Sequence, residues 1–150
     1  MKPAEARPAA VIIDIDGTVA NCRHRQHLVT GETPNWEAFF ASAALDESLP
    51  EGVAVANEHA LDSTVIWLTG RPERYRQLTA SWLAAQGLPT ANLHMRADDD
   101  MRPAAIYKVE RLGQLRGSFD IVLIIDDDDL VVTSLRQAGW LVQHAQWMAR

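Results

Sequence analysis

Hydrophobic and polar residues alternate along the chain in a pattern that predicts an α/β protein. Short apolar runs occur at residues 9–13, 64–68, 92–95, 120–125 and 140–144, and longer mixed segments separate them. Uninterrupted apolar runs such as IVLII are typical of strands that are covered on both faces. Strands that alternate with amphipathic segments favour a parallel sheet, so we expect an α/β domain built on one.

Amphipathic segments between these runs are predicted to form helices, at residues 51–61, 72–87, 103–116 and 128–138. The second of them shows the clearest signals. Pro72 stands in the first turn, Gly87 follows the last turn, and Tyr75, Leu78 and Trp82 fall on one face.

Residues 21–50 do not follow this alternation. A polar loop precedes a predicted short helix in which Trp36, Phe39, Phe40 and Ala43 form an apolar stripe. We interpret the stripe as core packing, while a ligand-binding or partner-binding surface stays open as the alternative. At 150 residues we expect one domain, residues 1–150, with a small cap at about 21–50.

The overall composition narrows the classes of protein. The chain is 47% apolar and 23% charged, which is typical of a soluble globular protein, and it contains no apolar run long enough to span a membrane. A net charge of -6 argues against a broad basic surface for long nucleic acids, although a local basic pocket stays open. A single cysteine, Cys22, fits a reducing compartment, and the N-terminal residues lack an apolar signal sequence, so we expect a cytoplasmic protein.

Polar residues follow three of the predicted strands directly. Asp14 and Asp16 come after the first strand, Thr69 after the second, and Asp126 and Asp127 after the fourth. Ligands of parallel α/β sheets collect at the carboxyl ends of the strands. We therefore expect these side chains to converge on one crevice.

A cluster of carboxylates requires a positive partner. Two carboxylates in close contact would repel each other by about 4 kcal/mol at an effective dielectric constant of 20. A hard divalent cation with oxygen ligands, Mg²⁺ above all, relieves this repulsion and also binds phosphate. Asp128 and Asp129 are instead interpreted as favourable charges at the start of the next helix.

Four stretches of the chain, DIDGT, LTGRP, the lone Lys108 and IIDDDD, resemble the signature motifs of haloacid-dehalogenase-type phosphohydrolases, in the order of that family. The resemblance implies a Rossmann-like parallel sheet with helices on both faces. It also implies Mg²⁺-dependent hydrolysis of phosphate monoesters through an aspartyl-phosphate intermediate.

The same resemblance implies roles for individual residues. Asp14 would be the nucleophile, and Asp16 the general acid and then the base that activates water. Lys108 would offset the charge that builds up on the phosphoryl group. Asp126 would bind Mg²⁺ directly, together with Asp14 and the backbone carbonyl of Asp16, and Asp127 would act directly or through another ligand.

The resemblance also implies a phosphate-binding turn. Thr69, with the amides of Gly70 and Arg71 at the start of the following helix, would hold the phosphoryl oxygens. Asp16 favours a phosphatase over family members that preserve their aspartyl-phosphate, and a phosphomutase would need a larger cap. A non-catalytic phosphate-binding module stays open as an alternative class.

A closer resemblance concerns the substrate. The stretches LTGRPERYRQL, LHMR, MRPAAIYKVE and IDDDDLVV are similar to the 3'-phosphatase domain of phage and bacterial polynucleotide kinases. It implies a phosphate-ester substrate at the 3' end of DNA or RNA, bound by Arg71, by Arg23 or Arg25, and by Arg102. A phosphatase of nucleotides or other small phosphate esters is the alternative.

Overall fold

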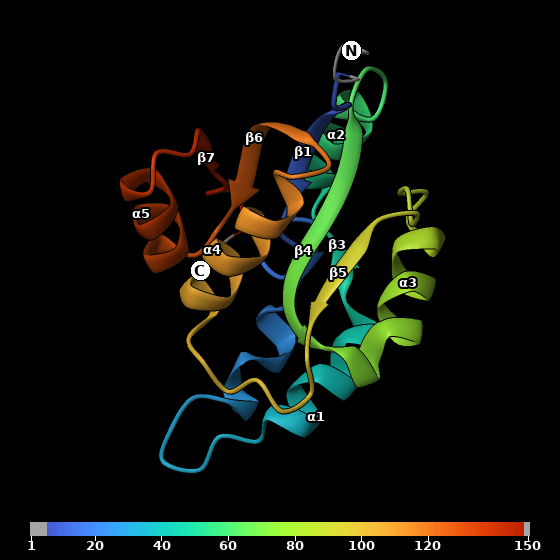
Figure 1. Cartoon of the computed structure of the whole chain (residues 1–150). Coiled ribbons are helices and arrows are strands. Elements are labelled where there is room, and N and C mark those ends of the chain that lie inside the picture. Colours follow the sequence, from blue (N-terminus) through green and yellow to red (C-terminus); the bar gives the residue numbers. More distant parts are fainter. Residues whose placement is uncertain (1–5, 149–150) are drawn as a thin grey trace.

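Five parallel strands form the central sheet of the computed structural model, which describes residues 6–148 (Figure 1). The strand order is β5-β4-β1-β6-β7. The strands are β1 (Ala9–Ile13), β4 (Thr64–Pro72), β5 (Leu93–Arg96), β6 (Asp120–Asp126) and β7 (Val142–His144). The predicted parallel α/β sheet is thereby confirmed, and each predicted apolar run contributes a strand.

Helices cover both faces of this sheet (Figure 1). They are α2 (Pro50–His59), α3 (Arg76–Ala85), α4 (Ala104–Leu115) and α5 (Asp129–Gln137). Successive side chains of β1 point to opposite faces. Val11 and Ile13 pack with residues of α2 and α3, whereas Ala10 and Ile12 pack with residues of α4 and α5. The strand is therefore apolar throughout because it is buried on both faces.

The segment after β4 differs from the prediction. The helix expected from Pro72 onward begins later, with a 3₁₀ turn η3 (Glu73–Tyr75) and then α3, because β4 continues as extended chain to Pro72. Pro72 pairs with Arg96 of β5, and this pairing holds the end of the strand in the sheet. The residues TGR at 69–71 are consequently part of a strand end and not of a helix start.

Residues 21–50 form a folded insertion between β1 and α2. Two short antiparallel strands, β2 (Ala20–Asn21) and β3 (Glu47–Ser48), bring its ends together. Between them lie the 3₁₀ helix η1 (Arg23–Leu28), where a loop was predicted, then α1 (Trp36–Ala41) and η2 (Ser42–Leu45). In Figure 1, α1 lies beyond the carboxyl ends of β4 and β5.

Among residues 6–148, no helix has the length and apolar character that crossing a membrane requires.

Candidate active site

Two aspartates and a lysine from three elements meet at the carboxyl end of the sheet. Asp14 follows β1, and its backbone amide donates to the carbonyl of Ile125 in β6 at 2.9 Å, so Asp14 and Asp126 lie on neighbouring strand ends. Lys108 reaches them from α4: its Nζ lies 2.9 Å from Asp14 and 2.6 Å from Asp126. All three side chains are buried.

Asp127 completes a group of three carboxylates. Asp14, Asp126 and Asp127 each offer an oxygen, and these oxygens all lie within 4.8 Å of one another. Gly17 allows this approach: it has a φ of 82°, and a Cβ added there would lie 2.0 Å from an oxygen of Asp127. A side chain at position 17 would therefore displace the carboxylate from the group.

The charge of this group fits a divalent cation. With all three carboxylates ionised, this group and the one ammonium would carry an excess of about two negative charges in a largely buried place, and oxygen donors in this number are the ligands that Mg²⁺ prefers. Burial and the neighbouring carboxylate of Asp126 raise the pKa of Asp14 well above its ordinary value, although Lys108 opposes the shift. The chemistry of the donor set thus fits a magnesium ion held by Asp14, Asp126 and Asp127.

Lys108 stays protonated in this setting. Burial acts against its charge, but the carboxylates of Asp126 and Asp14 outweigh burial and raise the pKa of Lys108. The ammonium group also donates hydrogen bonds to both carboxylates, so it fixes their orientation.

Asp16 lies apart from this group and is held by two arginines. Arg71 donates to its two oxygens from Nε at 3.1 Å and Nη2 at 2.7 Å, and Arg25 donates to it as well. Burial alone would raise the pKa of Asp16, but the charges of Arg71 and then Arg25 outweigh it and hold the pKa well below its ordinary value. Asp16 is therefore a carboxylate in this arrangement.

Asp46 is a buried partner of the same arginines that sequence reasoning missed. Its carboxylate accepts from Arg25 Nε at 2.9 Å and Nη2 at 2.7 Å, and it lies 3.7 Å from Arg71 Nη2. Asp16, Asp46, Arg25 and Arg71 form a network of two positive and two negative charges. Asp46 stands in no motif, and only its contacts with residues far away in the sequence distinguish it from a surface aspartate.

Thr69 and Gly70 line the pocket that contains the carboxylates. The hydroxyl of Thr69 accepts a hydrogen bond from the backbone amide of Arg71 at 3.1 Å, so this amide is already engaged. A Cβ at Gly70 would lie 3.2 Å from Nη2 of Arg96. Because the helix starts later than predicted, the amides of Gly70 and Arg71 are not at a helix N-terminus, and that part of the prediction is wrong.

The remaining candidate arginines occupy different places. Arg23 lines a separate hollow with His24, Leu45 and other residues, away from the carboxylates. Arg102 lines the main pocket and forms ion pairs with Asp100 at 2.8 Å and Glu110 at 2.6 Å.

Arg96 is a lining residue that sequence reasoning did not single out. It ends β5, and its Nη1 donates to the carbonyl of Arg102 at 2.8 Å. Among the described residues it forms no ion pair with a carboxylate. The stretch LHMR, quoted above as similar to polynucleotide 3'-phosphatases, contains this arginine, so the signal was present in the sequence.

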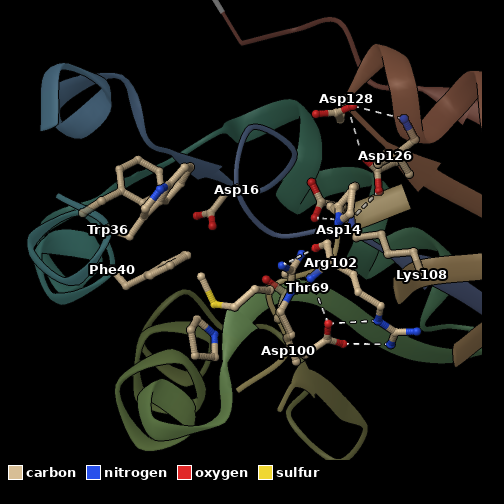
Figure 2. A pocket seen from close by; sticks show the side chains of 18 of the residues that line it. Asp14, Asp16, Trp36, Phe40, Thr69, Asp100, Arg102, Lys108, Asp126 and Asp128 are labelled. Atoms are coloured by element: carbon tan, nitrogen blue, oxygen red, sulfur yellow. Dashed lines mark hydrogen bonds and ion pairs between the residues drawn. The ribbon is translucent and has the colours of Figure 1, made fainter. Parts of the chain in front are cut away.

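The pocket itself is a cavity of about 500 Å³ at the carboxyl ends of the strands. Figure 2 shows Lys108 and Asp126 on one side, Trp36 and Phe40 on the opposite side, and Asp14 and Asp16 between them. A phosphate ester could place its phosphoryl group against Asp14 and still leave room for the alcohol that carries it.

Comparison with known families gives one match over nearly the whole chain. Residues 8–146 match the sequence profile of the family described as the polynucleotide kinase PNKP phosphatase domain. No curated protein sequence matches the chain.

Two solved structures of a Pnkp1/Rnl/Hen1 complex contain a chain that is similar to the present one over nearly its whole length. A chain in the structure of the Pnkp1/Rnl/Hen1 RNA repair complex superposes with a TM-score of 0.75 and 27% identity, over 94% of this chain and 44% of that chain. A second structure of the Pnkp1/Rnl/Hen1 complex gives a TM-score of 0.77, 27% identity, and coverage of 98% and 49%. The present chain thus spans about half the length of these relatives.

More distant structures share the fold alone. The class C acid phosphatase from Bacillus anthracis, with tungstate bound, has a TM-score of 0.66 and 16% identity, over 91% of this chain and 63% of that chain. A haloacid dehalogenase-like hydrolase from Streptococcus pneumoniae has a TM-score of 0.61 and 12% identity, over 93% and 85%. These matches confirm the Rossmann-like sheet expected from the sequence.

Proposed function

Because the chain belongs to the family of polynucleotide kinase PNKP phosphatase domains, within the haloacid-dehalogenase-type phosphohydrolases, we propose that it is a Mg²⁺-dependent phosphomonoesterase that removes 3'-phosphates from polynucleotide ends. The observation that supports this proposal most is the group of Asp14, Asp126, Asp127 and Lys108 in one cavity, in which all but Asp127 are buried. A buried excess of negative charge is unfavourable unless a bound cation compensates it, and such groups are typical of functional sites.

The proposed reaction begins with Asp14. One oxygen of its carboxylate attacks phosphorus in line with the ester oxygen, the bond between phosphorus and the ester oxygen breaks, and an aspartyl-phosphate forms. Lys108, 2.9 Å from Asp14, neutralises charge on the carboxylate and on the phosphoryl group. A magnesium ion bound by Asp14, Asp126, Asp127 and the backbone carbonyl of Asp16 would draw charge from the phosphoryl oxygens.

Asp16 is proposed as the group that moves protons. In the second half of the reaction its carboxylate accepts a proton from the water that attacks phosphorus, and the ionised state enforced by Arg71 and Arg25 suits this role. In the first half it donates to the leaving oxygen a proton that it takes up from solvent water when the substrate binds. That step requires the two guanidinium groups to exchange bonds with Asp16 for bonds with the phosphoryl group, which they can bind in the same bidentate way.

Thr69, Gly70 and the arginines complete the proposed phosphate site. Thr69 and Gly70 line the cavity beside Asp14, and Arg71 follows them on the same strand end. Arg25 and Arg102 are proposed as further contacts to the substrate. Arg23 is the weaker candidate of the early pair, because it lines a separate hollow.

The polynucleotide substrate is supported by the relatives and by the form of the site. One matched chain belongs to a complex described as an RNA repair complex, and the insertion at 21–50 is too small to enclose a metabolite as a separate cap domain would. We propose that residues 1–150 work as one phosphatase domain with this insertion as its cap. The free, buried Cys22 supports a cytoplasmic location.

A substrate panel tests the proposal. Phosphate release would be measured with Mg²⁺ for one oligonucleotide phosphorylated at its 3' end or at its 5' end, a 3'-mononucleotide and a sugar phosphate. We expect the highest kcat/KM for the 3'-phosphorylated oligonucleotide. Turnover of the small esters alone would contradict the polynucleotide assignment and favour the alternative, a phosphatase of nucleotides or other small phosphate esters.

A further inference from the structure

The aromatic stripe of α1 does not pack into the core as a whole. Phe39 and Ala43 are buried as the core-packing interpretation predicts, but Trp36 is 51% exposed and Phe40 is only partly buried. Trp36 and Phe40 line the same cavity as Asp14 (Figure 2). An indole left half exposed inside a cavity with the carboxylates points to a ligand that covers it.

The rings hold one another in place. Trp36 stacks on Phe40 with their centroids 6.0 Å apart and their planes at 27°, and the ring of Phe39 meets Trp36 edge-on at 5.5 Å. Phe40 in turn contacts Tyr75, at 5.5 Å between centroids. Asn35 caps the helix by accepting from the amide of Ala38 at 3.0 Å. The indole is therefore fixed before a ligand binds, so little conformational freedom is lost on binding.

The position of these rings indicates what they would bind. The phosphoryl group of the substrate belongs at Asp14, on one side of the cavity, and Trp36 lies across from Lys108 on the other side. A 3'-terminal nucleotide carries its phosphate on one side of the sugar and a flat aromatic base on another. We propose that Trp36, supported by Phe40, is the stacking platform for the nucleobase next to the 3'-phosphate, an inference that rests on the polynucleotide substrate proposed above.

Stacking of this kind is independent of base identity, because every base presents an aromatic face. It would let one site accept 3' ends of any sequence. Stacking of one base on an aromatic side chain strengthens binding by about 5-fold to 150-fold. We expect the base to strengthen binding about tenfold here, because Phe40 already covers one face of the indole.

The test uses two 3'-phosphorylated oligonucleotides that differ in one group. One ends in a normal nucleotide, and the other ends in a tetrahydrofuran residue that has the sugar and the phosphate but no base. Steady-state kcat and KM would be measured for the wild type, Trp36→Ala and Trp36→Phe. Leu61→Ala serves as the matched control, because Leu61 is 86% exposed and does not line the cavity.

We expect the wild type to prefer the base-bearing end about tenfold in kcat/KM, mainly through KM. Trp36→Ala should remove this preference and leave kcat on the baseless end unchanged, Trp36→Phe should retain part of it, and Leu61→Ala should retain all of it. Equal kinetics of the wild type on both ends would overturn the stacking proposal and leave the 3'-phosphatase proposal intact.

Two other outcomes also overturn it. If Trp36→Ala lowers kcat/KM equally on both oligonucleotides, the indole has a structural role. If the same loss comes with a change of molecular mass in light scattering, Trp36 takes part in self-association. Failure of the wild type on both oligonucleotides, with turnover of a sugar phosphate, would refute the proposed function itself and the stacking platform with it.

Discussion

Replacing Asp46 with asparagine removes one charge from a buried network of four. The side chains of Asp46, Arg25 and Arg71 are fully buried, and Asp46 accepts two hydrogen bonds from Arg25. Without its charge, two guanidinium groups face the single carboxylate of Asp16, and one positive charge is left buried without compensation. Removing one partner of a buried ion pair costs about 3–5 kcal/mol in the free energy of unfolding.

The corresponding change in melting temperature is large. For a chain of this size, 1 kcal/mol lowers Tm by about 2–4 °C, so Asp46→Asn should lower Tm by about 6–20 °C. Urea unfolding followed by circular dichroism would give the free energy directly, and an unchanged m-value would show that the two-state treatment still holds.

Glu73→Ala provides the matched control. Glu73 also accepts two hydrogen bonds from one arginine, Arg76, at 2.9 and 2.8 Å, but both side chains are exposed to solvent by more than 40%. Exposed pairs contribute about 0–1 kcal/mol, so this variant should lose little stability. If Asp46→Asn loses no more than Glu73→Ala, burial of the network is not what makes it stabilising, and the reasoning is refuted.

Three further predictions concern single positions and the metal. Gly17→Ala should lower both stability and phosphate release, because the new Cβ would lie 2.0 Å from Asp127 and the φ of 82° disfavours alanine; normal kinetics of this variant would show that Asp127 is not needed. Burial raises the pKa of the Cys22 thiol to about 11, so a disulfide reagent at pH 8 should label it only after urea unfolds the chain, and rapid labelling of the native protein would contradict its burial. EDTA should abolish activity and Mg²⁺ should restore it; Mg²⁺ at about 100 times its Kd should also stabilise the fold by about 2.7 kcal/mol, a gain that Asp126→Asn should lose.

The sheet and the convergence of its polar residues could be predicted from local pattern. Apolar runs such as residues 120–125 mark strands buried on both faces, and parallel strands bring their carboxyl ends to one edge. Asp14, Asp126 and Thr69 follow such runs directly, so the cavity that they share could be predicted from these runs.

Contacts between distant segments could not be predicted in this way. Arg25 stands in a polar stretch that is typical of a surface loop, but it is buried and paired with Asp16 and with Asp46, which lies twenty-one positions later. The continuation of β4 to Pro72 depends on pairing with Arg96, which local signals at the proline do not reveal. The stripe of α1 predicts an apolar face, but helical spacing does not distinguish Phe39, which is buried, from Trp36, which lines the cavity and is half exposed.

The most direct test of the account is phosphate release by Asp14→Asn from a 3'-phosphorylated oligonucleotide in the presence of Mg²⁺. The substitution keeps the size of the side chain and removes the attacking oxygen anion, so we expect release to fall at least about 1,000-fold, while circular dichroism and gel filtration match the wild type. Asp128→Asn is the matched control, because Asp128 accepts from the amides of Leu130 and Val131 at the start of α5, and it should keep most of the activity. Substantial release by a folded Asp14→Asn protein would contradict the assignment of Asp14 as the nucleophile.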